Sequence, residues 1–334
     1  MNELTSNNLF DKIAALLESA QKKTLTIVNQ TIVYTYFEIG RMIVEEEQKG
    51  RNRADYGTKL IDDVSKRLTR HFGKGFSETN LKQMRQFYLV YSKSQTLSDE
   101  FKLSWSHYLK LIRIDDINER KFYEIESIKN NWSLRELQRQ YDSGLFPRLM
   151  LSIDKDKIWE LSTKGQIIEK PKDAIKDPYV LEFLGLPEKS EYSESDLEQR
   201  LIDKLEHFLL ELGTGFTFVG RQCRITFDEK HFKIDLVFYN RILRCFVLID
   251  LKIGELKHQD IGQMQMYVNY YDREVKLRDE NKTIGIILCQ DKSETVVKYT
   301  LPENNEQIFA SKYLTVLPSK EALKKLIEES DKLN

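Results

Sequence analysis

Apolar residues recur at every third or fourth position through most of residues 1–145, which is the spacing of amphipathic helices. The pattern is clear in residues 13–17 and 60–68. Ser77 is a good N-cap for the segment that follows it, and the SLRE capping box of residues 133–136 starts another helix. This part of the chain is therefore predicted to be all-helical, either as a helix-turn-helix-like module or as helices packed without a nucleic-acid role.

The pattern changes twice further along the chain. Residues 149–194 contain three of the six prolines and many charges, and they are predicted to connect two domains. The domains are predicted to be a helical one of residues 1–148 and an α/β one of residues 195–334. The elements predicted in the second domain are a helix over 195–213 that ends at Gly213, a strand over 216–227, a hairpin of 232–240 and 243–252, a helix over 259–275, a strand over 283–290, a helix over 293–301, a strand over 312–318 and a final helix over 319–330.

The hairpin contains charged residues where its apolar pattern predicts burial. Asp235 lies in the first strand, and Asp250 and Lys252 end an almost uninterrupted apolar run in the second. Because side chains alternate along a strand, Asp250 and Lys252 share a face. With residues 240–243 as the loop, Asp235 is predicted to lie opposite Leu248, and Asp250 is its diagonal neighbour on the same face.

Burying two carboxylates beside one lysine is costly unless the charges are neutralised. An ion pair between Lys252 and one acid would leave the other carboxylate uncompensated. A hard divalent cation solves this problem, because Mg²⁺ binds carboxylate oxygens, a backbone carbonyl and waters. Lys252 would then orient or help to deprotonate a metal-bound water. The residues favour a metal site, and a buried salt bridge at the end of the sheet is the alternative.

Asp235 followed by Asp-Leu-Lys at residues 250–252 resembles the signature of the PD-(D/E)xK nucleases, with Asp at a position where Glu is common. The next helix contains Gln263 and Tyr267, which is similar to the QxxxY element of the RecB-like branch. Longer phrases resemble the YhcG-like (DUF1016) family, in which a helical N-terminal domain precedes a PD-(D/E)xK domain. These phrases are GFSETNLKQMRQFY, LSWSHY, FLLELGTGFTFVGRQ, IDLVFYNRILRCFVLIDLK and GQMQMYVNYYD.

The resemblance implies a fold and a metal-dependent chemistry. The implied fold is α/β and restriction-endonuclease-like, with a mixed central sheet flanked by helices. Asp235, Asp250 and the backbone carbonyl of Leu251 are then the expected ligands of Mg²⁺ or Mn²⁺, and Lys252 assists the attacking water.

Three further residues are candidates for the same site. Gln263 and Tyr267 lie four positions apart on one helical face, and both are expected to act at the metal site; alternatively, Tyr267 belongs to the core. Glu198, on the helix before the sheet, is the candidate third carboxylate. Alternatively, Glu198 completes a capping box that begins at Ser195.

The net charge of −1 conceals a basic segment. Residues 51–110 contain 12 Lys and Arg but 6 Asp and Glu, a balance that can attract phosphate. The best candidates for contacts with nucleic-acid phosphates are Arg70, Lys74, Lys82 and Arg85. The alternative is an ordinary solvated face of mixed charge.

The remaining features concern the cellular setting and the substrate. The three cysteines form no CxxC pair, so they are interpreted as reduced thiols of a cytoplasmic protein, and no apolar stretch is long enough for a membrane span. By analogy with the superfamily, DNA is favoured over RNA as the substrate. Endonuclease action is favoured because the chain has no helicase module, and a homodimer is expected because cutting both strands needs two sites. The rival hypothesis is a non-catalytic nucleic-acid-binding or assembly subunit.

Overall fold

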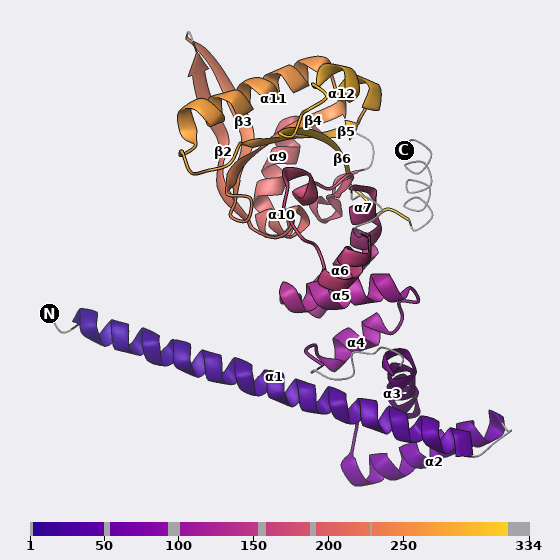
Figure 1. Cartoon of the computed structure of the whole chain (residues 1–334). Coiled ribbons are helices and arrows are strands. Elements are labelled where there is room, and N and C mark those ends of the chain that lie inside the picture. The colour runs from indigo at the N-terminus through magenta and orange to yellow at the C-terminus, as the bar shows by residue number, and fades with distance from the viewer. Residues whose placement is uncertain are drawn as a thin grey trace. The chain divides into compact units, whose positions relative to one another are not determined.

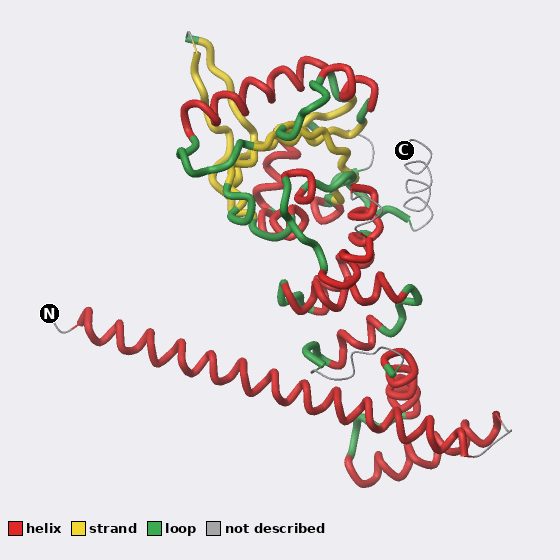
Figure 2. The backbone as a smooth tube through the Cα atoms, viewed as in Figure 1, coloured by secondary structure: helices red, strands yellow, loops and turns green. Residues whose placement is uncertain are grey.

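The computed structural model describes residues 3–49, 54–92, 101–152, 158–187, 192–227 and 229–319. The chain forms two compact units, Met1–Gln138 and Arg139–Asn334 (Figure 1). The first unit is helical, and all strands of the described chain lie in the second (Figure 2). None of the described helices is long and apolar enough to cross a membrane.

The first unit is built around the packing of two helices. Its helices are α1 (Glu3–Lys49), α2 (Ala54–Phe72), α3 (Glu78–Tyr91), α4 (Trp105–Leu111) and α5 (Ile117–Lys129), and α6 (Leu134–Asp142) spans the boundary between the units. Phe37 of α1 packs against Phe87 of α3, with ring centroids 5.8 Å apart. A Cβ atom on Gly40 would lie 2.1 Å from the Met84 carbonyl oxygen, so glycine is required where α1 crosses α3. Ser77 caps α3 as predicted, because its Oγ accepts a hydrogen bond from Asn80 N at 3.3 Å.

The second unit contains one mixed six-stranded sheet in the order β1-β6-β5-β4-β3-β2. The strands are β1 (Tyr179–Val180), β2 (Phe216–Phe227), β3 (Lys230–Asn240), β4 (Cys245–Glu255), β5 (Ile284–Asp291) and β6 (Ile308–Leu314). Strand β3 is antiparallel to both of its neighbours, β2 and β4, whereas β5 is parallel to β4, and β6 and β1 continue in parallel. The central strand β4 therefore joins the antiparallel and parallel halves of the sheet.

Helices pack on both faces of this sheet, as the predicted fold requires (Figure 1). The helices and helical turns of the unit are α7 (Leu145–Ser152), α8 (Ile158–Lys164), η2 (Pro171–Ala174), η3 (Glu182–Leu184), α9 (Glu194–Asp203), α10 (Leu205–Leu212), α11 (His258–Tyr270), η4 (Tyr271–Val275) and α12 (Glu294–Thr300). One core contains Leu201 of α9 and Phe208 of α10 against Phe238 of β3. The other contains Met264 of α11 against Leu248 of β4. The prediction of a mixed sheet flanked by helices, with a helical N-terminal part, is confirmed.

Three details differ from the sequence-based expectation or extend it. The helix predicted over 195–213 is two helices, α9 and α10, because the backbone leaves the helical conformation at Lys204 (φ −117°, ψ 31°). The segment 149–194, predicted as a connection, contributes β1 and buried core residues to the second unit. The final helix predicted over 319–330 lies outside the described residues, apart from its first position. The predicted domain boundaries stay a prediction.

Candidate active site

The two acidic residues of the hairpin lie side by side because of its register. The last ladder pair of β3 and β4 at this end is Leu236 with Ile249, so Asp235 and Asp250 come next on each strand. The predicted register, with Asp235 opposite Leu248, is wrong by two residues. A shift of two residues keeps every side chain on the same face of the sheet, so Asp235 and Asp250 still share a face, as predicted.

The turn explains the shift. The loop contains four residues, as expected, but these are residues 241–244, and Asn240 is the last residue of β3, paired with Cys245. The buried Asn240 side chain closes the turn, because its Oδ1 accepts hydrogen bonds from the backbone N of Ile242 and of Leu243, both at 3.0 Å. Arg244 completes the turn in the left-handed region (φ 50°).

Asp250 is the more buried acid of the pair. It is 3% exposed, and its Oδ2 lies 2.7 Å from Lys252 Nζ. Apart from this ion pair, no described residue makes a hydrogen bond to Oδ2. Burial, and then the charge of Asp235, raise the pKa of Asp250 to about 7 although Lys252 opposes the shift.

Asp235 is fixed by two donors on its two oxygens. Its Oδ2 accepts a hydrogen bond from the backbone N of Leu251 at 2.8 Å, and its Oδ1 accepts one from Gln222 Nε2 at 3.1 Å. Asp235 is thus attached both to the backbone of β4 and to the side chain of β2. Such double anchoring fixes the orientation of a carboxylate before any ligand binds.

Glu198 extends the site from α9. The helix begins with Ser193 as N-cap and Asp196 as its capping-box partner, so the predicted alternative of a box from Ser195 to Glu198 is wrong. Glu198 Oε2 instead accepts a hydrogen bond from Gln222 Nε2 at 2.5 Å. Burial and the nearby Asp235 charge raise the pKa of Glu198, so the two acids are close enough to repel each other.

Gln222 and Arg221 are site residues that the sequence reasoning missed. Gln222 donates to both Glu198 and Asp235, and its backbone is in the left-handed region (φ 49°), which is uncommon for a residue with a side chain. Arg221 Nε lies 3.3 Å from Glu198 Oε1, an oxygen that otherwise has no hydrogen bond within the described chain. A signal was available, because the polar pair Arg-Gln interrupts the apolar strand sequence directly after Gly220.

Lys252 is held between carboxylates. Besides Asp250, its Nζ lies 4.0 Å from Glu194 Oε2. Burial lowers the pKa of Lys252, but the charges of Asp250 and Glu194 outweigh it and raise the pKa above the usual value. While Asp250 is charged, Lys252 is therefore a protonated hydrogen-bond donor at the site rather than a base.

Gln263 and Tyr267 contact each other and β3. Gln263 Nε2 donates to Tyr267 Oη at 2.5 Å, and this hydroxyl donates to the Lys233 carbonyl oxygen at 2.9 Å. The ring of Tyr267 is fully buried in the core under α11, as the alternative interpretation predicted. Burial, and then the Asp250 charge, raise the pKa of Tyr267 to about 12, so the hydroxyl keeps its proton. A role for Gln263 and Tyr267 in catalysis stays a prediction.

The oxygen-rich site fits a hard divalent cation. Among the described residues, no three His, Cys, Asp or Glu side chains converge as a ready-made metal cage. However, Asp235 and Asp250 lie on adjacent strands, the Leu251 carbonyl lies between Asp250 and Lys252 in the chain, and Glu198 is near Asp235. Buried Asp250 Oδ2 and Glu198 Oε1 accept no hydrogen bond in the described chain beyond their ion pairs with Lys252 and Arg221, so both oxygens could also bind a cation.

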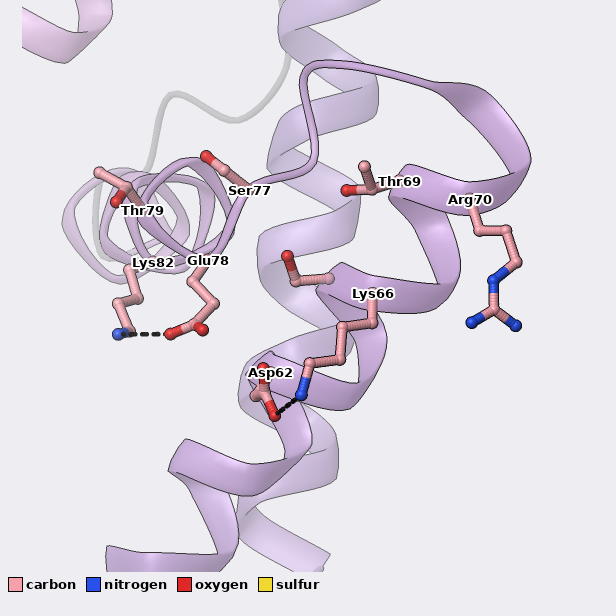
Figure 3. A pocket seen from close by; sticks show the side chains of 9 residues that line it. Asp62, Lys66, Thr69, Arg70, Ser77, Glu78, Thr79 and Lys82 are labelled. Atoms are coloured by element: carbon pink, nitrogen blue, oxygen red, sulfur yellow. Dashed lines mark hydrogen bonds and ion pairs between the residues drawn. The ribbon is translucent and has the colours of Figure 1, made fainter.

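The phosphate-contact candidates lie on α2, α3 and the turn between them. Arg70 and Lys82 line an open pocket of about 830 Å³ between the two helices (Figure 3). Lys82 is paired with Glu78 at 3.2 Å, and Arg85 with Glu47 at 2.7 Å. Lys74 is exposed in the turn. The structure therefore brings Arg70 and Lys82 to one pocket, whereas Arg85 forms an ion pair with Glu47 of α1.

Two family models and a curated protein match most of the chain. The family model described as the YhcG PDDEXK nuclease domain matches residues 172–328, and the model described as the DUF1016 N-terminal domain matches residues 12–148. A protein of Escherichia coli (strain K12) named "Putative nuclease YhcG" is 40% identical over 345 residues, which cover 94% of this chain and 92% of that protein.

Two solved structures have a weaker likeness. A repair endonuclease from Pyrococcus abyssi matches with 16% identity and a TM-score of 0.25, over 40% of this chain and 50% of its own. A complex described as EndoMS-dsDNA2 matches with 14% identity and a TM-score of 0.26, over 36% of this chain and 46% of its own. Each match thus spans about half of the solved chain.

Proposed function

The chain belongs to the YhcG family, whose C-terminal domain is a PD-(D/E)xK nuclease domain, and from this premise we propose that it is a metal-dependent endonuclease that hydrolyses the phosphodiester bonds of DNA. The observation that carries the proposal is the buried Asp250. This carboxylate lies beside Asp235, is paired with Lys252, and its pKa is raised to about 7. A group so perturbed, with a specific charge partner, is characteristic of functional sites.

The residues of the site divide into metal ligands and residues that position them. Asp235, Asp250 and the Leu251 carbonyl would hold Mg²⁺ or Mn²⁺, and Glu198 would add a third carboxylate. Gln222 holds Glu198 and Asp235 together through its amide. When bound, the cation polarises a phosphate oxygen and lowers the pKa of a bound water.

Lys252 contributes a positive charge next to the ligands. Its raised pKa keeps it protonated while Asp250 is ionised, so we assign it the role of donating a hydrogen bond to the attacking water or to a phosphate oxygen. Deprotonation of the water is therefore not assigned to Lys252. Gln263 is proposed to contact a water or phosphate, and Tyr267 to support the site through the backbone of β3.

The first unit is proposed to bind the substrate. Arg70 and Lys82 line one pocket between α2 and α3, and Lys74 is exposed in the turn that joins these helices, which suits the sequence-independent attraction of phosphates. The preference for DNA over RNA rests on analogy with the PD-(D/E)xK superfamily. A cytoplasmic location agrees with the three cysteines, which are all unpaired.

The test is cleavage of supercoiled, linear, branched and single-stranded DNA, and of RNA, by the purified full-length protein with Mg²⁺, Mn²⁺ or EDTA. We expect metal-dependent cleavage of DNA that is lost in Lys252→Ala and Asp250→Ala. Glu206→Gln is the matched control, because Glu206 is an exposed acid on α10. Binding without cleavage under every condition would support the rival function, a nucleic-acid-binding or assembly subunit.

A further inference from the structure

The N-terminal half of α1 has an apolar face that its own unit leaves uncovered. Figure 1 shows this half of the helix extending beyond α2 and α3. Exposed large apolar side chains occur along residues 9–34 of α1, and Leu25 and Ile32 lie off the main face. Six that share one side of the helix are between 48% and 70% exposed, and we call this set the apolar stripe: Phe10, Ile13, Leu16, Leu17, Ile27 and Tyr34. Exposed apolar patches of this extent mark interaction surfaces.

The apolar stripe lies on the opposite side of α1 from the face that packs in the unit. With about 100° of rotation per residue, all members of the stripe lie within about 60° of Ile13. By the same rotation, Val33 and Gly40 lie about 160–180° from Ile13, and Phe37 lies about 120° from it. Most of the stripe therefore faces away from α3.

The stripe has the spacing of a coiled-coil seam. Positions 10, 13, 17, 20, 24, 27, 31 and 34 alternate steps of three and four residues, which is the heptad pattern of core positions. Ala20, Thr24 and Thr31 occupy the remaining core positions with small side chains. A seam of this kind is complementary to another helix with the same period.

The same helix of a second copy is the best match for length. Residues 9–34 of α1 extend over about 39 Å, whereas the next-longest described helix, α2 with 19 residues, spans about 29 Å. Exposed large apolar residues elsewhere in the described chain are scattered over separate elements. We propose that α1 is a dimerisation helix whose apolar stripe pairs with the stripe of a second copy of this chain.

The area and charge of the surface suit such a pair. If a fully exposed large apolar side chain offers about 150 Å², the stripe with its neighbours Leu9 and Val28 offers roughly 700 Å² per copy. A standard stable interface uses about 800 Å² per partner, and polar residues beside the stripe supply the remainder. Residues 9–34 contain two acids and three bases, so little net charge opposes the approach of two copies.

Sedimentation equilibrium of the full-length chain, from about 1 to 100 µM, tests the pairing. We expect the native chain to have twice its mass of 39.6 kDa. Ile13→Glu/Leu17→Glu places two charges in the stripe and is expected to give a monomer. Ala15→Glu/Ser19→Glu adds the same charges to the same turns at exposed positions on the other face, and is expected to remain a dimer.

Two results would overturn the inference. A native chain that is monomeric throughout this range would show that the stripe does not pair with a second copy. A dimer retained by the stripe variant would locate the interface elsewhere. Circular dichroism of each variant separates loss of pairing from loss of folding, since the substituted side chains are exposed. The measured masses do not depend on nuclease activity, so this experiment tests the dimer independently of the proposed function.

Discussion

A buried charge network in the second unit makes its stability depend on one carboxylate, Glu211. This residue of α10 and Arg148 of α7 are both fully buried, with Arg148 Nη1 2.5 Å from Glu211 Oε1. Arg139 Nη2 lies 3.3 Å from the other oxygen, and the backbone N of Val180 donates to Oε1 at 3.0 Å. Lys176 Nζ donates to the Glu211 backbone carbonyl. Replacing Glu211 with Gln would remove the buried negative charge that Arg148 and Arg139 contact.

The loss of stability expected for Glu211→Gln can be calculated in two ways. Burial alone would raise the pKa of Glu211, but the charges of Arg148, Lys176 and Arg139 lower it from 4.5 to about 2. At about 1.4 kcal/mol per pKa unit, this difference corresponds to about 3 kcal/mol of stability at pH 7. Removing one partner of a buried ion pair costs about 3–5 kcal/mol in other proteins, which agrees with the value obtained from the pKa shift.

The sign of the pH dependence is fixed by the direction of the shift. Because the folded-state pKa of Glu211 is lower than the unfolded value, its contribution is fully present above about pH 4.5 and is lost as the pH falls towards 2. We therefore expect Glu211→Gln to reduce the free energy of unfolding by about 3 kcal/mol at pH 7. The difference from the native protein should shrink between pH 4.5 and 2.

Urea-dependent hydrogen exchange of the amides in β3, β4 and β5 is the assay, because it reports the stability of the second unit alone. The control is Glu182→Gln, since Glu182 also pairs with Arg139 but its side chain is 18% exposed; we expect it to cost less than about 1 kcal/mol. A cost below about 1 kcal/mol for Glu211→Gln, or a cost that does not change with pH, would refute the reasoning.

Three other predictions concern the candidate site and the first unit. Asp250→Asn should raise Tm in EDTA at pH 8 but not at pH 4, because a pKa raised to about 7 means that ionisation of Asp250 destabilises the fold as the pH rises. The variant should also lose any rise in Tm that Mg²⁺ causes in the native protein. An unchanged response to Mg²⁺ would show that Asp250 is not a metal ligand. Gln222→Ala should weaken Mg²⁺ binding measured by calorimetry about 10-fold, because it releases Glu198 and Asp235, and unchanged binding would exclude a positioning role. Gly40→Ala should destabilise the first unit by roughly 1–3 kcal/mol in urea unfolding, because the Cβ of the alanine would clash with the Met84 carbonyl oxygen. An unchanged free energy of unfolding would mean that α1 and α3 separate easily.

The sequence determined most elements of the second unit but not how they meet. Period-two alternation located β3 and β4 and placed Asp235 and Asp250 on one face. Their register depended on whether Asn240 ends the strand or begins the loop. This was decided by the hydrogen bonds that Asn240 Oδ1 accepts from the turn, which strand periodicity does not encode.

The third carboxylate shows a similar limit. Glu198 fitted a capping box as well as a ligand, because Ser195 and Ser193 both precede acids at the capping spacing. Only the start of α9 at Glu194 separates the two possibilities. Gln222 was missed for another reason: its position opposite Asp235 depends on a one-residue irregularity in β2 between Phe218 and Gly220.

That irregularity also affects how the protein behaves in a crowded solution. Strand β2 is the last strand at its edge of the sheet, so one side of its backbone has no neighbouring strand in the described chain. Long regular edges of this kind recruit strands from other molecules and start aggregation. The extra residue at Val219 and the left-handed Gln222 break the regular spacing of that edge, and Arg221 and Arg224 add charge to it. The bulge that aligns Gln222 with Asp235 thus also protects the sheet from pairing edge to edge.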